Sequence, residues 1–65
     1  MSEKKVNALT RGFLSLSEFE QKSALVEFWA KSRQKEDWFY SLLKGKVFAA
    51  DNGEGGYTLM LAEEY

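Results

Sequence analysis

Apolar residues recur at helical spacing through the first two thirds of the chain. In residues 6–16, Val6, Leu9 and Phe13 follow one another at intervals of three and four, which is typical of one face of a short helix. Residues 18–33 carry a wider apolar stripe, which spreads over roughly 200° of a helix. A stripe this wide predicts a central helix with contacts on two sides. Its members are Phe19, Leu25, Val26, Phe28, Trp29 and Ala30.

The start of this second helix is marked by the sequence Ser17-Glu18-Phe19-Glu20. Ser followed three residues later by Glu is a capping box, in which the hydroxyl accepts from the Glu20 amide and the carboxylate reaches back. The polar positions Glu20, Glu27 and Lys31 fall together on the remaining side of the helix, and Glu27 and Lys31 stand in the favourable i,i+4 order. We therefore expect a helix from about Glu18 to Arg33.

A polar segment, residues 32–37, separates this helix from the next apolar stripe. That stripe, Trp38, Phe39, Leu42 and Leu43, is out of phase with the preceding one by roughly 120° if the helix ran straight on. The phase break predicts a turn and a third helix that starts at Glu36 or Asp37 and ends at Gly45. A single helix over residues 18–44 is the alternative.

The C-terminal third predicts a β-hairpin. Asn52-Gly53 lies between two short segments rich in apolar residues, 46–50 and 57–62, and Asn-Gly suits the positive φ angles of a type I′ turn. Such a turn would oppose Phe48 to Tyr57, whereas a six-residue loop over residues 51–56 is the alternative. The predicted fold is α+β, with two or three short helices followed by a two-stranded C-terminal hairpin. Residues 1–5 are expected to be a flexible N-terminus, residues 6–62 a single small domain and residues 63–65 a polar tail.

Composition limits what can stabilise this domain. A chain of 65 residues with no Cys and no His has no disulfide and lacks the commonest soft metal ligands, so we expect neither a metal nor another cofactor. The ten aromatic residues are a large apolar supply for this length. No apolar run approaches the ~20 residues of a membrane span. We expect a cytoplasmic protein without membrane contact.

Catalytic chemistry has little support. Without His, a serine nucleophile would depend on a Ser–Lys arrangement, and the paired carboxylates fall at a helix start, in a polar turn and near the C-terminus. Gly53, Gly55 and Gly56 precede a strand rather than opening a helix, and the acidic Asp51 and Glu54 beside them would repel phosphate. We expect no enzymatic activity and assign no catalytic residue.

The aromatic residues are the better functional candidates. Trp38-Phe39-Tyr40 would span about 200° of a helix, so the three rings would not all face one core. Trp and Tyr are enriched at the energetic centres of protein interfaces. We therefore expect a non-enzymatic protein-interaction module that self-associates, for example as a homodimer, or docks on a larger partner. The candidate contact residues are Trp29, Trp38, Tyr40 and Tyr57.

The alternative is a small DNA-binding regulator. The stretch Leu42-Leu43-Lys44-Gly45-Lys46-Val47, followed by Gly56-Tyr57-Thr58-Leu59, resembles the end of a recognition helix that runs into the wing of a winged-helix domain. That resemblance implies a helix in the DNA major groove. The net charge of −1 supplies no long-range attraction for nucleic acid. The candidate contacts would be Lys31, Arg33, Lys35, Lys44 and Lys46.

Overall fold

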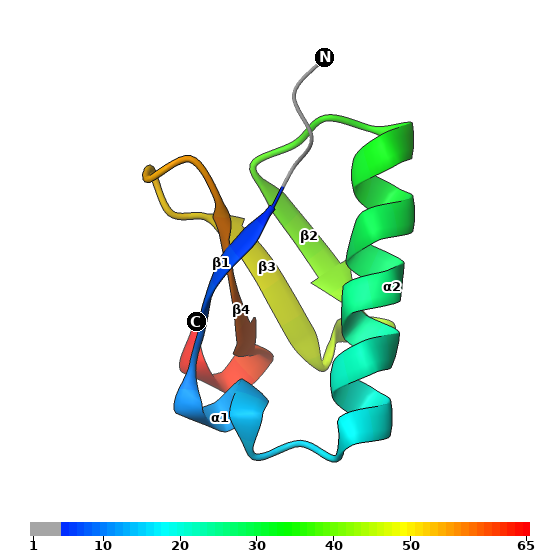
Figure 1. Ribbon diagram of the computed structural model, residues 1–65, viewed down its shortest axis with the longest axis vertical. Coiled ribbons are helices and arrows are strands. Elements are labelled where there is room, and N and C mark those ends of the chain that lie inside the picture. The colour runs from blue at the N-terminus through cyan, green and yellow to red at the C-terminus, as the bar shows by residue number, and fades with distance from the viewer. Residues whose placement is uncertain (1–4) are drawn as a thin grey trace.

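A four-stranded sheet covered on one face by a single long helix makes up the molecule (Figure 1). The computed structural model describes residues 5–65. In chain order the elements are β1 (Val6–Leu9), α1 (Arg11–Leu14), α2 (Glu18–Gln34), β2 (Phe39–Leu42), the 3₁₀ turn η1 (Leu43–Gly45), β3 (Val47–Asp51), β4 (Tyr57–Leu61) and the 3₁₀ turn η2 (Ala62–Glu64).

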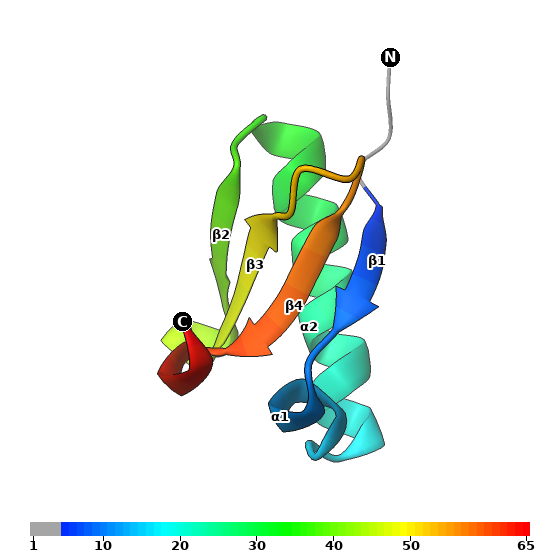
Figure 2. The same cartoon turned by 90° about the vertical axis from the view of Figure 1, so that its left-hand side faces the viewer.

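The sheet is mixed and its strand order is β1-β4-β3-β2. Strands β2, β3 and β4 form an antiparallel meander, and β1 pairs parallel to β4. Figure 2 looks onto the face of the sheet that α2 leaves open, with the helix behind the strands. The domain thus has two layers, with β1 and β2 as the edges of the sheet.

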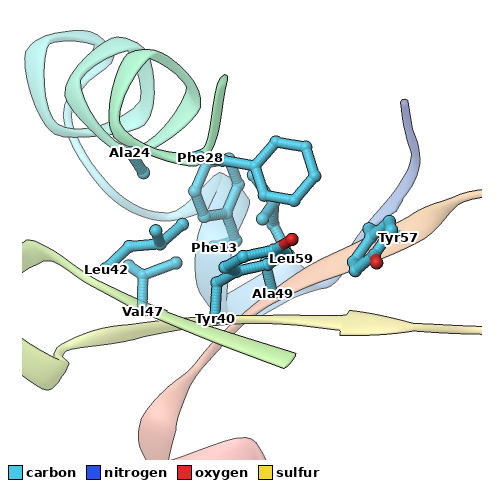
Figure 3. Packing of buried hydrophobic residues seen from close by; sticks show 9 residues of the cluster. All are labelled: Phe13, Ala24, Phe28, Tyr40, Leu42, Val47, Ala49, Tyr57 and Leu59. Carbon is cyan, nitrogen blue, oxygen red and sulfur yellow. The ribbon is translucent and has the colours of Figure 1, made fainter. Parts of the chain in front are cut away.

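The core lies between α2 and the sheet (Figure 3). Side chains that alternate along the strands meet two inward residues of the helix, as the period-2 geometry of strands requires. Phe28 from α2 contacts the rings of Tyr40 and Tyr57, with ring centroids 5.5 and 5.1 Å apart. The buried hydrophobic residues are Phe13, Ala24, Phe28, Tyr40, Leu42, Val47, Ala49, Tyr57 and Leu59.

The predicted start of the second helix is confirmed. Ser17 is the N-cap of α2, and its side chain accepts a hydrogen bond from the amide of Glu20. The Glu20 carboxylate also lies against the Ser17 hydroxyl. The helix ends at Gln34, so the alternative of one helix over residues 18–44 is wrong.

The predicted helix over residues 6–16 is wrong. Val6–Leu9 forms strand β1 on the edge of β4, and Thr10 then caps the one-turn helix α1 by accepting from the amide of Phe13. The spacing of Val6 and Phe13 does fit a helix, but the pairing of residues 6–9 with the distant strand β4 decides their conformation over so short a segment.

The predicted third helix is also wrong, because its residues form strand β2 and the turn η1. Tyr40 and Leu42 face the core and Phe39 lies on the opposite side, which is strand alternation. The four-residue separation of Trp38 and Leu42 suited a helix, but the adjacent aromatic residues suit a strand that has a side chain on each face. The architecture of two or three helices followed by a lone hairpin is therefore contradicted.

The hairpin exists, but it forms the centre of the sheet and its register differs from that of a two-residue turn. Phe48 pairs with Met60 and Asp51 with Tyr57, which leaves residues 52–56 as the loop. The amide of Asn52 donates to the carbonyl of Gly56 across the loop base. The longer-loop alternative is closer to the structure, because Gly55 also takes a positive φ.

The segment predicted as a polar tail, residues 63–65, is folded onto the domain. Glu64 accepts hydrogen bonds from the hydroxyl of Thr10 at 2.6 Å and from the amide of Leu61 at 2.9 Å. The pKa of Glu64 lies below its ordinary value, and the hydrogen bond from Thr10 is the largest cause. Residues 1–4 of the predicted flexible N-terminus lie outside the described residues, and the carbonyl of Lys5 accepts from the amide of Tyr57.

Gly53→Val should destabilise the domain by about 1–2 kcal/mol, because Gly53 has φ +76° and a left-handed conformation is strained for residues with a Cβ. No atom lies within 4 Å of the added Cβ position, so the cost is conformational rather than steric. Chemical denaturation of the two proteins measures it. An unchanged free energy of unfolding would contradict the turn geometry.

Candidate interaction surfaces

Three charged side chains of α2, those of Glu20, Glu27 and Lys31, point along the helix flank toward the β2–β3 hairpin. The Glu27 carboxylate accepts from the amide of Leu43 at 3.1 Å. Lys31, paired with Glu27 at 3.0 Å, donates to the carbonyl of Ser41 at 2.6 Å. These polar residues therefore tie α2 to the end of edge strand β2, where backbone groups would otherwise be unpaired.

Another ion pair continues the same flank. Glu20 accepts from the ammonium group of Lys46 at 2.6 Å. The pKa of Glu20 lies below its ordinary value, and this hydrogen bond is the largest cause. The stripe predicted to be polar thus lies beside the hairpin, and the side of α2 farthest from the sheet is left to other residues.

Apolar side chains occupy that outward side. Phe19 is 79% exposed, Val26 66% and Trp29 55%. At about 100° per residue, Val26 lies opposite the midpoint of Ala24 and Phe28, the two residues of α2 in the core. We call Phe19, Lys22, Val26, Trp29 and Arg33 the helix stripe. Its apolar members are all more than half exposed.

The helix stripe is also locally organised. The Arg33 guanidinium carbon lies 4.7 Å from the ring centroid of Trp29, a cation–π contact. Such contacts at exposed sites contribute about 0.5–1 kcal/mol and restrict both side chains. A large aromatic ring that is held in one place on the surface is a suitable anchor for binding, since little conformational entropy remains to be lost.

A second aromatic group, which we call the sheet cluster, lies on the open face of the sheet. Phe39 contacts Phe48 with ring centroids 4.9 Å apart, and Tyr65 contacts both rings at 5.4 and 5.6 Å. Trp38 adds a contact with Phe39 at 5.5 Å. Phe39 and Phe48 are half-buried by these neighbours, so the sheet cluster partly covers itself.

The four predicted contact residues fall in three different places. Trp29 belongs to the helix stripe and Trp38 to the sheet cluster, on opposite layers of the domain. Tyr40 and Tyr57 are in the core, 6% and 4% exposed. The Tyr40 hydroxyl donates to the carbonyl of Lys35, and the Tyr57 hydroxyl donates to that of Asp37. These two tyrosines fasten the segment between α2 and β2.

Sequence reasoning placed Phe19 and Val26 in a stripe but did not select them as contact residues. Phe19, Val26 and Trp29 are spaced along the sequence as residues of one helix face are, but this spacing fits a buried face as well as an exposed one. Phe39, Phe48 and Tyr65 were not selected either: the sequence placed Phe39 in a predicted third helix, Phe48 in the hairpin and Tyr65 in a polar tail. Which face of a helix or strand is covered depends on the other layers of the fold, and a single chain pattern does not specify it.

The predicted basic contacts do not form one surface. Lys31 and Lys46 are engaged with carboxylates of α2, Lys35 lies 3.6 Å from Asp37, and Arg33 lies over Trp29. Lys44 is exposed in η1. The segment that resembled a recognition helix is strand β2 and its turn, so the architecture that implied major-groove binding is absent.

An open hollow lies beside the helix flank, lined by Glu27, Lys31, Ser41, Leu43, Lys44 and Gly45. Its paired charges, Glu27 and Lys31, already bond to backbone groups of the hairpin. Within residues 5–65, no three or more acidic side chains come together as they would to hold a metal ion.

Comparisons with protein-family models, curated proteins and solved structures give no match to this chain. Across the part of the chain that the structure describes, no helix has both the length and the apolar character needed to cross a membrane.

The free energy of unfolding should fall between pH 6 and pH 3, in part through Glu27. Burial alone would raise the pKa of Glu27, but hydrogen bonds from Leu43 and Lys31 outweigh it and the pKa is lowered from 4.5. A carboxyl with a lowered folded-state pKa stabilises the fold above its unfolded pKa, and this contribution is lost as pH falls through the folded value.

Glu27→Gln keeps the acceptor oxygen and removes the charge. This variant should be less stable than the wild type at pH 6 and should converge with it near pH 3, as measured by urea denaturation across the range. A constant difference between the two proteins at every pH would contradict an electrostatic role for Glu27.

Proposed function

We propose that this protein is a non-enzymatic protein-interaction module whose contact surface is the helix stripe of α2. The observation that carries the proposal is the inverted polarity of this helix. Its charged residues Glu20, Glu27 and Lys31 bind the hairpin, while Phe19 and Val26 are exposed on the side away from the sheet. Folding the domain gives no reason for apolar residues there.

The size of these side chains strengthens the proposal. Single exposed apolar residues are common on protein surfaces, whereas adjacent large ones indicate interaction sites. Phe19, Val26 and Trp29 follow one another along about three turns of one helix face, and Leu25 beside them is 40% exposed. Lys22 lies between Phe19 and Val26 along this face and Arg33 lies at its C-terminal end, and Arg is among the residues enriched at protein interfaces.

The helix stripe is a better candidate than the sheet cluster. The rings of Phe39, Phe48 and Tyr65 contact one another and so retain part of their burial without a partner. Phe19 has no ring neighbour among the described residues.

The absence of Cys from the sequence supports a reducing compartment such as the cytoplasm as the place of action.

Site-specific photo-cross-linking tests the proposal. A photoreactive phenylalanine analogue replaces Val26 in cells that express the protein, and the same analogue at Lys44, exposed in η1, is the control. We expect discrete cross-linked products from position 26 that are absent from position 44. These products should disappear when Phe19 and Trp29 are also changed to Gln.

Identical product patterns from positions 26 and 44 would contradict the proposal. So would products that persist after the Phe19→Gln and Trp29→Gln changes, because binding would then not depend on the helix stripe. Circular dichroism of each purified variant shows whether the fold is retained.

A further inference from the structure

We infer that the occupant of the helix stripe is a second copy of this chain, with the two α2 helices packed antiparallel about a twofold axis near Val26. The inference rests on the proposed function and names the partner of the same surface. It follows from the spacing of the outward residues and from the distribution of charge along α2.

The spacing of the stripe is that of a helix–helix seam. Phe19, Lys22, Val26, Trp29 and Arg33 follow one another at alternating intervals of three and four residues. This is the a/d pattern by which two helices pack against each other along their length. The pattern runs almost the full length of α2, which at 1.5 Å per residue is about 25 Å.

Charge decides the direction of pairing. The first turn of α2 is acidic, with Glu18 and Glu20, and the last turn is basic, with Lys31 and Arg33. Antiparallel packing brings Glu18 of each copy to Arg33 of the other. Parallel packing would instead place Glu18 against Glu18 and Arg33 against Arg33. The helix dipoles also favour the antiparallel arrangement, since each positive end then meets a negative end.

The same alignment gives the middle of the stripe compatible neighbours, and it places Phe19 opposite Ser32 of the other copy. With the axis between Leu25 and Val26, these two apolar residues meet their counterparts at the centre. Lys22 then lies opposite Trp29 of the second copy, where a cation–π contact can form. A twofold contact of this kind is self-complementary, as closed homodimers require.

The dimer leaves the other layer of each copy free. Phe39 and Phe48 alternate with core residues along β2 and β3, so the sheet cluster lies on the face of the sheet opposite α2, which is the open face in Figure 2. Both clusters would therefore point outward from the dimer. The ion pairs Glu27–Lys31 and Glu20–Lys46 lie on the flank of α2 that faces the hairpin, so dimerisation need not break them.

Sedimentation equilibrium of the purified protein, from low to high micromolar concentration, tests the inference. We expect a reversible monomer–dimer equilibrium. Val26→Glu puts two like charges beside each other at the axis and should weaken dimerisation at least about tenfold. Val26 is 66% exposed in the single chain, so the monomer should still fold, which circular dichroism checks.

A charge-reversal pair makes the test independent of Val26. Glu18→Arg alone and Arg33→Glu alone each create two repulsive contacts in the homodimer and should each weaken it by about threefold to tenfold. A 1:1 mixture of the two variants should form a heterodimer of near wild-type affinity, because both contacts are then between opposite charges. Lys44→Glu, with the same charge change as Arg33→Glu but outside the seam, should leave dimerisation unchanged.

A wild-type protein that is monomeric at every concentration would overturn the inference, as would a dimer that is insensitive to Val26→Glu or a mixture that shows no recovery. The proposed function would survive a monomeric result if cross-linking from position 26 still yields specific products with other proteins. A monomer without such products would remove both.

Discussion

Phe28→Ala is expected to destabilise the domain by about 3–5 kcal/mol, the usual cost of removing a buried aromatic ring. Phe28 is 3% exposed and is the large residue by which α2 enters the core, where it packs against Tyr40 and Tyr57 (Figure 3). A domain of this length has a total stability of about 3–10 kcal/mol. The loss is therefore a large part of the total stability, and the melting temperature of the variant should fall well below that of the wild type, as thermal denaturation followed by circular dichroism would show.

Phe19→Ala is the matched control, with the same change in the same helix. Phe19 is 79% exposed, so the loss should be within about 0.5 kcal/mol. Equal losses at the two positions would contradict the division of α2 into a core face and an outward face.

Leu59→Ala is expected to cost about 2–5 kcal/mol. Leu59 is fully buried in β4, which has β1 on one side and β3 on the other. Equilibrium unfolding in urea measures the loss.

Met60→Ala is the control for this strand. Met60 is the next residue of β4, half-buried on the open face of the sheet, so the cost of its truncation should be clearly smaller. A greater loss at Met60 than at Leu59 would mean that the register of β4, and with it the core face of the sheet, is wrong.

The elements predicted correctly from the sequence are those fixed by local interactions. Ser17 and Glu20 are three residues apart, and their capping hydrogen bond depends on no other part of the chain. Asn52-Gly53 likewise marks a turn whatever its surroundings. The start of α2 and the presence of the β3–β4 hairpin were therefore predictable.

The two missed strands depend on distant partners. Strand β1 is four residues long and forms only because β4, some fifty residues later, offers an open edge. Strand β2 is also four residues long, and its apolar residues fit a helical spacing as well as a strand. Pairing across the sheet decides both cases, and it lies outside any local pattern.

The candidate surface was partly visible in the sequence. The wide apolar stripe of α2 predicted contacts on two sides, and the structure provides a covered side at Phe28 but none at Val26. The polar stripe was predicted on the remaining side of the helix, and in the structure its residue Glu27 accepts a hydrogen bond from the hairpin. Only the position of the sheet shows that the second side of the stripe is left uncovered.

The central claim is that the apolar residues on the outward face of α2 do not serve the folding of this chain. The direct test is the free energy of unfolding, at low micromolar concentration, of a variant that carries Phe19→Gln, Val26→Gln and Trp29→Gln together. The account predicts a value within about 1 kcal/mol of the wild type, because all three side chains are more than half exposed. A loss of about 3 kcal/mol or more would show that these residues stabilise the monomer, and would contradict their assignment to a contact surface.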